Sequence, residues 1–180
     1  MKKNADKALL LLENFQKGQI KPTIVFDYKR LAKLLAIKVL FGSENFDWRD
    51  IKFYYDPFRE VLVPLAKEVN SDGNLKDDGW WIKENLENSK TISDNEKDFL
   101  NLFFKDEKFY KEYLNQLFKI KELDLNNILE KNDIKNIIKK VNSNYLYRDT
   151  KFDIKNLSYN QKMINYKMTN HVLFHKQNGH

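Results

Sequence analysis

Lysine and tyrosine side chains alternate through the last fifty positions of the chain, and these residues have the most evident chemical use. Lysine ammonium groups neutralise phosphates, and exposed aromatic rings stack on bases. The pattern therefore predicts a surface that contacts nucleic acid through its phosphate backbone. The predicted contact residues are Lys135, Lys139, Lys140, Tyr145, Tyr147, Arg148, Lys151, Lys155, Lys162 and Lys167.

The distribution of charge supports this interpretation. Residues 131–180 hold ten basic and three acidic residues, a net charge of +7, whereas residues 1–130 hold 22 basic and 23 acidic residues, a net charge of −1. Nine of the ten basic residues are lysine, which favours backbone contact over the bidentate base contacts of arginine. The alternative is a solvated helix face with its tyrosines turned inward, whose lysines reflect an AT-rich genome.

Two histidines form a second candidate site. His171 and His175 stand four positions apart, which places both imidazoles on one face of a helix, as a metal-binding pair requires. No third ligand is evident, because the chain has no cysteine and no glutamate follows His171. The histidines equally suit packing or a surface position, so we predict no metal and no cofactor.

Two further motifs have incomplete ligand sets. Residues 68–75 resemble the start of an EF-hand calcium loop, but Gly79 stands where a bidentate glutamate closes such a site. We expect an ordinary turn between helices there. Asp27 and Lys29 follow an apolar run, as in metal-dependent nucleases, but the second carboxylate that holds magnesium is missing.

The adjacent Trp80 and Trp81 are candidates for a protein contact. We expect one ring to anchor the core and the other to be exposed, and an exposed tryptophan is typical of an interface. The alternative is that helix packing buries both rings.

The elements that position these residues are predicted to be helices. The chain has only five Gly and three Pro, too few for the many turns of a sandwich or barrel. Apolar residues recur at helical spacing, and Ser93–Glu96 and Ser158–Gln161 match capping boxes that begin helices. We expect an all-α, bundle-like fold with short strands possible over 23–26 and 145–147. The predicted helices cover residues 5–16, 27–41, 57–69, 80–88, 93–117 with a break near 106, 125–141 and 158–175.

We expect one domain over residues 1–180, with a near-neutral helical core (1–130) and a basic C-terminal segment (131–180). No stretch reaches the roughly twenty apolar residues that span a bilayer, and the N-terminus lacks the cleavage pattern of a signal peptide. The lack of cysteine excludes disulfides and thiolate metal sites. These features favour a cytoplasmic protein without membrane contact.

The favoured hypothesis is a non-catalytic accessory or adaptor protein whose basic C-terminal segment contacts nucleic acid. The alternative is a protein–protein interaction subunit of a larger complex, in which the lysines meet an acidic partner or aid solubility. A metal-dependent enzyme that uses His171 and His175 is the third hypothesis. No nucleotide-binding glycine loop and no nucleophile elbow is present in the sequence.

Overall fold

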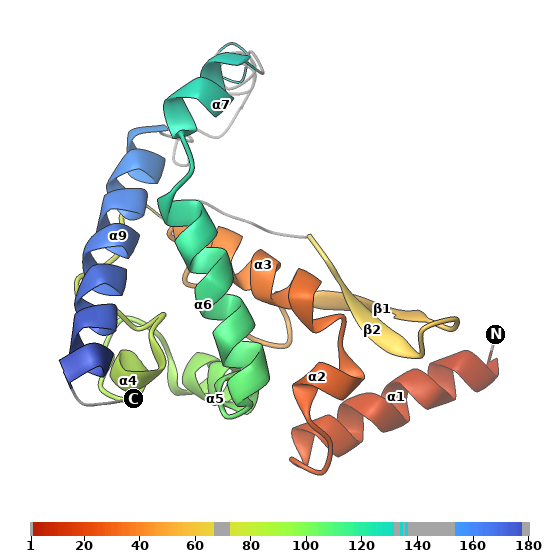
Figure 1. Ribbon diagram of the computed structural model, residues 1–180. Helices are drawn as coiled ribbons and strands as arrows, with labels where there is room; N and C mark the ends of the chain where they lie inside the picture. Colours follow the sequence, from red (N-terminus) through yellow and green to blue (C-terminus); the bar gives the residue numbers. More distant parts are fainter. Residues whose placement is uncertain (1, 67–72, 132–133, 135, 137–153, 178–180) are drawn as a thin grey trace.

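A computed structural model describes residues 2–66, 73–131, 134, 136 and 154–177 (Figure 1). Two strands, β1 (Lys52–Asp56) and β2 (Val61–Leu65), form an antiparallel hairpin. The other regular elements among these described residues are helices, which confirms the predicted mostly helical class. The helices are α1 (Lys2–Gln16), α2 (Pro22–Val25), α3 (Tyr28–Leu40), α4 (Lys83–Leu86), α5 (Asp94–Phe104), α6 (Glu107–Lys121), α7 (Leu125–Lys131) and α9 (Ile154–Gln177).

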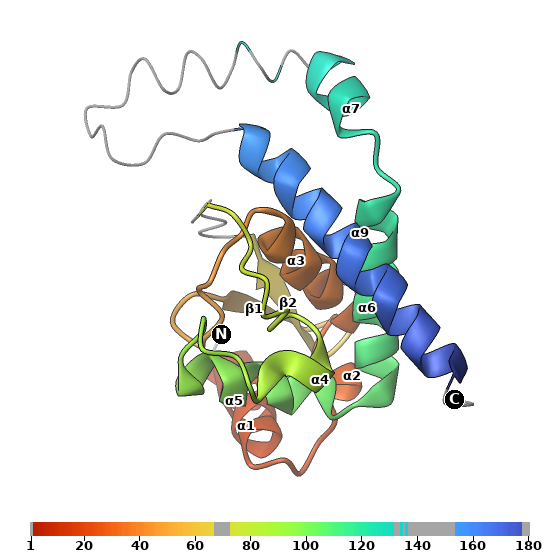
Figure 2. The same cartoon turned by 90° about the vertical axis from the view of Figure 1, so that its left-hand side faces the viewer.

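Helices α3 and α6 pack against each other and run in the same general direction. At their N-terminal ends, Lys108 Nζ of α6 lies 5.2 Å from the ring centroid of Tyr28 in α3. Towards their C-terminal ends both helices contact α9, which crosses them (Figure 2). The apolar stripe of α3 that the sequence predicts, including Leu31 and Leu35, is buried in this arrangement. Three helices far apart in the sequence therefore share one core.

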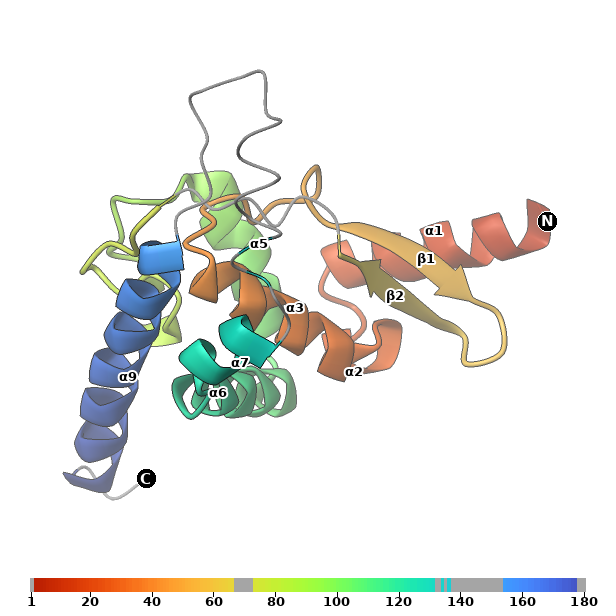
Figure 3. The same cartoon turned by 90° about the horizontal axis from the view of Figure 1, so that it is seen from above.

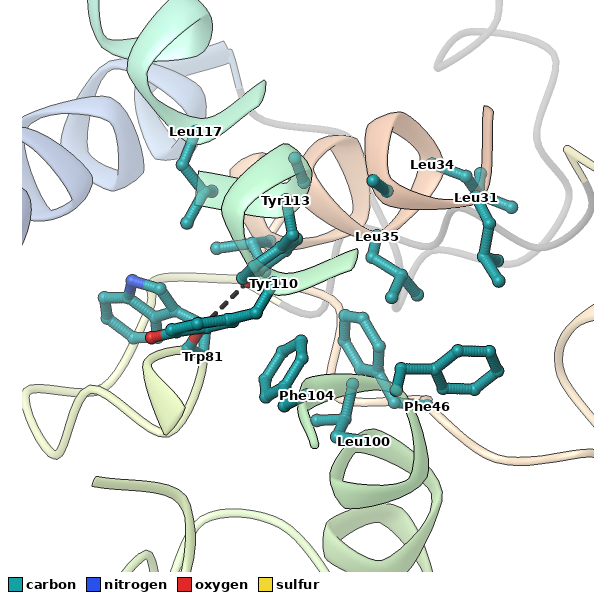
Figure 4. Packing of buried hydrophobic residues seen from close by; sticks show 14 of the residues in the cluster. Leu31, Leu34, Leu35, Phe46, Trp81, Leu100, Phe104, Tyr110, Tyr113 and Leu117 are labelled. Atoms are coloured by element: carbon teal, nitrogen blue, oxygen red, sulfur yellow. Dashed lines mark hydrogen bonds between the residues drawn. The ribbon is translucent and has the colours of Figure 1, made fainter. Parts of the chain in front are cut away.

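Aromatic rings fill much of that core. In Figure 4, Tyr113 of α6 lies beside Phe104 of α5, with ring centroids 5.0 Å apart. The Tyr113 hydroxyl donates a hydrogen bond of 3.0 Å to the backbone carbonyl of Trp81. Burial raises the pKa of Tyr113 well above its ordinary value, so the hydroxyl stays protonated and remains a donor. A second aromatic group joins α1 to α5, with Phe15 and Phe103 centroids 5.0 Å apart.

The helix predicted over residues 57–69 is wrong, because residues 61–65 form β2 instead. Asp56 directs the turn: its Oδ1 accepts hydrogen bonds from the backbone N–H groups of Phe58 (2.9 Å) and Arg59 (3.2 Å). The following Val-Leu-Val run favours a strand. Pro64 is compatible with β2 because each strand of a two-stranded sheet is an edge strand.

The strand expected over 23–26 is also wrong. Residues Pro22–Val25 form the short helix α2, with proline in its first turn, and only Phe26 joins a bridge, to Leu62. The other expected strand, 145–147, lies outside the described residues. Helix α1 lies beside the hairpin (Figure 3), where Lys7 Nζ and Glu60 Oε1 are 2.7 Å apart.

Capping residues predicted some helix boundaries correctly and one incorrectly. Glu96 accepts hydrogen bonds from the backbone N–H and the hydroxyl of Ser93, and α5 begins at the next residue. Asp106 caps α6, which confirms the predicted break. Ser158 does not begin the last helix, because α9 already starts at Ile154. The helix expected over 80–88 is confined to the four residues of α4.

Candidate nucleic-acid interface

Helix α9 has a buried face that fixes its orientation. Leu157, Asn160, Ile164 and Met168 are all buried on this face, at the spacing of successive helical turns. Asn160 Nδ2 donates hydrogen bonds of 3.0 Å to the carbonyl oxygens of Leu40 and Gly73. Its Oδ1 accepts a hydrogen bond of 2.7 Å from the backbone N–H of Leu75. These bonds hold α9 against the C-terminal end of α3.

The neighbouring Gln161 holds the same helix against the end of α6. Gln161 Nε2 donates to the carbonyl oxygens of Ile120 at 2.8 Å and Leu123 at 2.7 Å. These two acceptors lie where α6 ends, and the last carbonyl groups of a helix have no partner within it. The predicted capping residue therefore serves the C-terminus of α6 and not the N-terminus of its own helix.

On the opposite face of α9, four of the exposed residues form what we call the α9 stripe: Lys155, Tyr159, Lys162 and Tyr166. Steps of four, three and four residues keep them on one side of the helix. Within this stripe, Tyr159 is 43% exposed and Tyr166 is 59% exposed. Residues 154–177 contain no aspartate or glutamate. Cations and accessible rings thus alternate along the helix surface.

Lys167 is the third of the described lysines in the predicted contact set, and it lies outside the stripe. Its Nζ is 2.9 Å from Asp77 Oδ1 and donates to the Asp77 carbonyl at 2.6 Å. This lysine is thereby held to the loop before α4. The remaining predicted contact residues lie outside the described part of the chain: Lys135, Lys139, Lys140, Tyr145, Tyr147, Arg148 and Lys151.

Trp80 and Trp81 are both buried, with exposed fractions of 1% and 0%. The expectation of one exposed ring is therefore wrong. Their ring centroids lie 5.8 Å apart in an edge-to-face arrangement, and Trp80 also packs on Phe46 at 4.9 Å. The partner-binding role predicted for these residues has no accessible indole ring to act through.

The structure assembles no metal centre from the residues it describes. No group of three or more His, Cys, Asp or Glu side chains is positioned there to hold an ion. His171 and His175 fall in α9, but their side chains are outside the described part of the structure, as are residues 68–72 of the calcium-loop segment. Asp27 of the nuclease-like motif caps α3, and its Oδ2 lies 2.7 Å from Arg59 Nη1.

Two carboxylates with shifted pKa values, Asp47 and Asp50, lie in the loop before β1. Burial tends to raise the pKa of Asp47, but hydrogen bonds and the charge of Arg49 outweigh it and lower that pKa. Burial and the adjacent Asp47 raise the pKa of Asp50. Arg49 Nε lies 2.7 Å from Asp47 Oδ2, so Asp47 already has a cationic partner. We assign it a structural role in this loop.

Two grooves beside α6 form a cationic surface that sequence reasoning missed. Their volumes are about 1070 Å³ and about 740 Å³, and Glu112 and Asn115 line both. Three acidic residues line them: Asp106, Glu107 and Glu112. Eight basic residues line them: Lys21, Lys29, Arg30, Lys33, Lys105, Lys108, Lys111 and Lys119.

The spacing of lysines along α3 and α6 is the sequence feature that indicates this surface. Lys29 and Lys33 are four residues apart on the side of α3 that faces away from its apolar stripe, and Lys108 and Lys111 are three apart on α6. The net charge of residues 1–130 does not reveal these lysines, because acidic residues elsewhere in that range balance their charge.

No protein-family model matches the chain, and neither a curated protein nor a solved structure shows significant similarity to it. Among the described helices, none combines the length and the apolar character needed to cross a membrane.

Proposed function

We propose that the protein is a non-catalytic accessory protein that binds single-stranded nucleic acid, with the α9 stripe as a principal contact. The observation that carries this proposal is the alternation of lysine and tyrosine on one exposed face. Eleven residues separate Lys155 from Tyr166, so the stripe extends for about 16 Å along the helix. The basic residues predicted within 131–151 extend the proposed contact along the chain.

The two residue types have different tasks in this proposal. Lys155 and Lys162 neutralise phosphates, which supplies an affinity that depends strongly on salt. Tyr159 and Tyr166 offer ring faces to unstacked bases, which a continuous duplex does not present. This division favours a single strand and requires no base-specific hydrogen bonds.

The test is the affinity of the full chain for a labelled single-stranded oligonucleotide, measured by fluorescence anisotropy at several salt concentrations. A double variant with Lys155→Gln and Lys162→Gln should reduce the slope of log K against log salt by about 1.4, which is about 0.7 per phosphate contact. Tyr159→Ala and Tyr166→Ala should each weaken binding by roughly 1–3 kcal/mol, mainly independently of salt.

Matched controls come from exposed residues outside α9. Lys52 and Lys90 are exposed, and Tyr54 is 44% exposed, close to Tyr159. Lys52→Gln, Lys90→Gln and Tyr54→Ala should leave affinity and salt slope unchanged. Binding that is absent at low salt, or equal losses in the stripe and control variants, would contradict the proposal.

A further inference from the structure

The smaller groove beside α6 combines an apolar floor with a basic rim. The apolar residues of its lining, which we call the floor, are Ile37 of α3, Ile120 of α6 and Leu123. The rim carries Lys29, Arg30, Lys33 and Lys119, all of them exposed. Leu123 is 39% exposed, which is high for an apolar side chain in a recess. A ligand that binds this groove can therefore bury apolar surface on the floor and pair acidic groups with the basic rim.

The dimensions of this groove match a short helix. Its lining extends from Lys29 to Ile37 on α3 and from Glu112 to Ile120 on α6, about 12 Å in each case at helical rise, and Leu123 lies just beyond the end of α6. Because α3 and α6 run in the same direction, the two walls stay together over this distance. Two to three turns of a docked helix have a comparable length, roughly 11–16 Å.

The charge of the groove is not balanced by its own acidic residue. Glu112 is the one carboxylate in the lining, and its Oε1 already accepts a hydrogen bond of 2.5 Å from Gln116 Nε2. Arg30 Nε lies 3.4 Å from Asp27 Oδ2, but that carboxylate oxygen is also 2.7 Å from Arg59 Nη1. The four basic residues of the rim therefore outnumber the carboxylate of Glu112, and the lining keeps a net positive charge that attracts an anion.

We propose that this groove docks an acidic amphipathic helix of a protein partner. The apolar side of such a helix would cover Ile37, Ile120 and Leu123, while its glutamate or aspartate residues would pair with the basic rim. A phosphate backbone would satisfy the rim but would leave the floor without an apolar partner. The floor therefore favours a protein helix over nucleic acid, and the site is independent of the α9 stripe.

The test uses a synthetic amphipathic peptide with leucines at i, i+3, i+4 and i+7 and glutamates on the flanking positions. A scrambled peptide of the same composition is the specificity control. The amphipathic peptide should bind the full chain, and its binding should shift backbone NMR resonances of α3 and α6 in preference to those of the hairpin. The scrambled peptide should bind at least about tenfold more weakly.

Variants separate the rim from the floor. Lys33→Glu combined with Lys119→Glu should weaken peptide binding about tenfold or more, whereas Lys52→Glu should not. Leu123→Gln should weaken peptide binding about fivefold and leave oligonucleotide affinity unchanged. Because Lys33, Lys119 and Leu123 are exposed, these variants should retain the wild-type unfolding midpoint.

Three results would overturn the assignment. One is equal affinity for the amphipathic and scrambled peptides. Another is unchanged peptide binding by Leu123→Gln, which would leave a purely electrostatic surface. The third is competition in which an oligonucleotide displaces the peptide from the wild type and loses affinity in the Lys33→Glu, Lys119→Glu variant. The variant with Lys155→Gln and Lys162→Gln should bind the peptide normally, so failure of the nucleic-acid proposal remains distinguishable.

Discussion

Asn160 Nδ2 in α9 donates a hydrogen bond of 3.0 Å to the carbonyl oxygen of Leu40, the last residue of α3. The same amide also bonds Gly73 and Leu75, and the side chain is fully buried. A buried amide with its donors and acceptor engaged stabilises one arrangement, because any displacement leaves polar atoms without partners. This contact sets which face of α9 is exposed.

Replacing this amide should destabilise the fold. Asn160→Ala removes the three hydrogen bonds of a buried side chain, so we expect the free energy of unfolding to fall by about 2–4 kcal/mol in urea denaturation. Asn165→Ala is the matched control, since Asn165 is exposed on the same helix and should change stability by less than about 0.5 kcal/mol. Equal effects of the two substitutions would contradict the role of Asn160.

Gly42 should be intolerant of a side chain for two separable reasons. Its φ is +67°, and a Cβ atom built there would overlap the carbonyl oxygen of Gly73. Gly18 has a similar φ of +72°, but nothing lies within 4 Å of its Cβ position. Gly18→Ala should therefore cost only the left-handed backbone strain, about 1 kcal/mol. Gly42→Ala should cost clearly more, about 3 kcal/mol, and similar unfolding free energies for both variants would contradict the close packing.

Trp81→Ala should lower the stability of the folded protein. The ring is 0% exposed, so its removal leaves a cavity and should lower the free energy of unfolding by about 3–5 kcal/mol. The control is Phe58→Ala, because Phe58 is 96% exposed and its loss should change stability by less than about 0.5 kcal/mol. A stable Trp81→Ala protein with lost partner binding would instead support the interface role.

Acid should destabilise the protein in part through Asp78. Burial tends to raise the pKa of Asp78, but hydrogen bonds from the Ser89 and Thr91 hydroxyls, at 2.6 and 2.7 Å, help to lower it below its ordinary value. The contribution of the carboxylate to stability is therefore complete above the unfolded-state pKa near 4 and is lost as the pH falls towards the lower folded-state pKa. Urea denaturation at pH 7, 5 and 3 measures this loss.

Asp78→Asn should remove part of that acid dependence, so the wild type and the variant should differ less at pH 3 than at pH 7. Thr91→Val removes one of the two hydroxyl donors and should reduce the acid dependence without removing the carboxylate. An identical pH dependence in the wild type and Asp78→Asn would show that other carboxylates account for the loss.

Local signals predicted much of the helical structure. The helix expected over 27–41 is α3, which Asp27 caps and Gly42 follows, and Ser93 with Glu96 begins α5. The hairpin escaped prediction because Pro57 is as compatible with a helix start as with a turn. The hydrogen bonds of Asp56 and the pairing with β1 decided between them, and neither is a property of periodicity within residues 57–69.

One of the two candidate surfaces could be predicted from local spacing, and the other depends on packing between distant helices. Lys155, Tyr159, Lys162 and Tyr166 share a face because of their spacing, so their alignment could be predicted from sequence. The spacing of Lys29 and Lys33 places both on one face of α3, but the grooves beside α6 could not be predicted, since Lys33 and Lys119 come together only when α3 packs on α6.

The amino-acid sequence by itself determined the helical class, several helix boundaries and the lysine–tyrosine character of the last segment. Each of these depends on residues within a few turns of one another, where helical periodicity and capping act. The tertiary structure alone decided that both tryptophans are buried, that Asn160 orients α9 and that a basic groove surrounds an apolar floor. These features depend on contacts between distant segments, whose free energy comes from shared burial and is not visible in any local pattern.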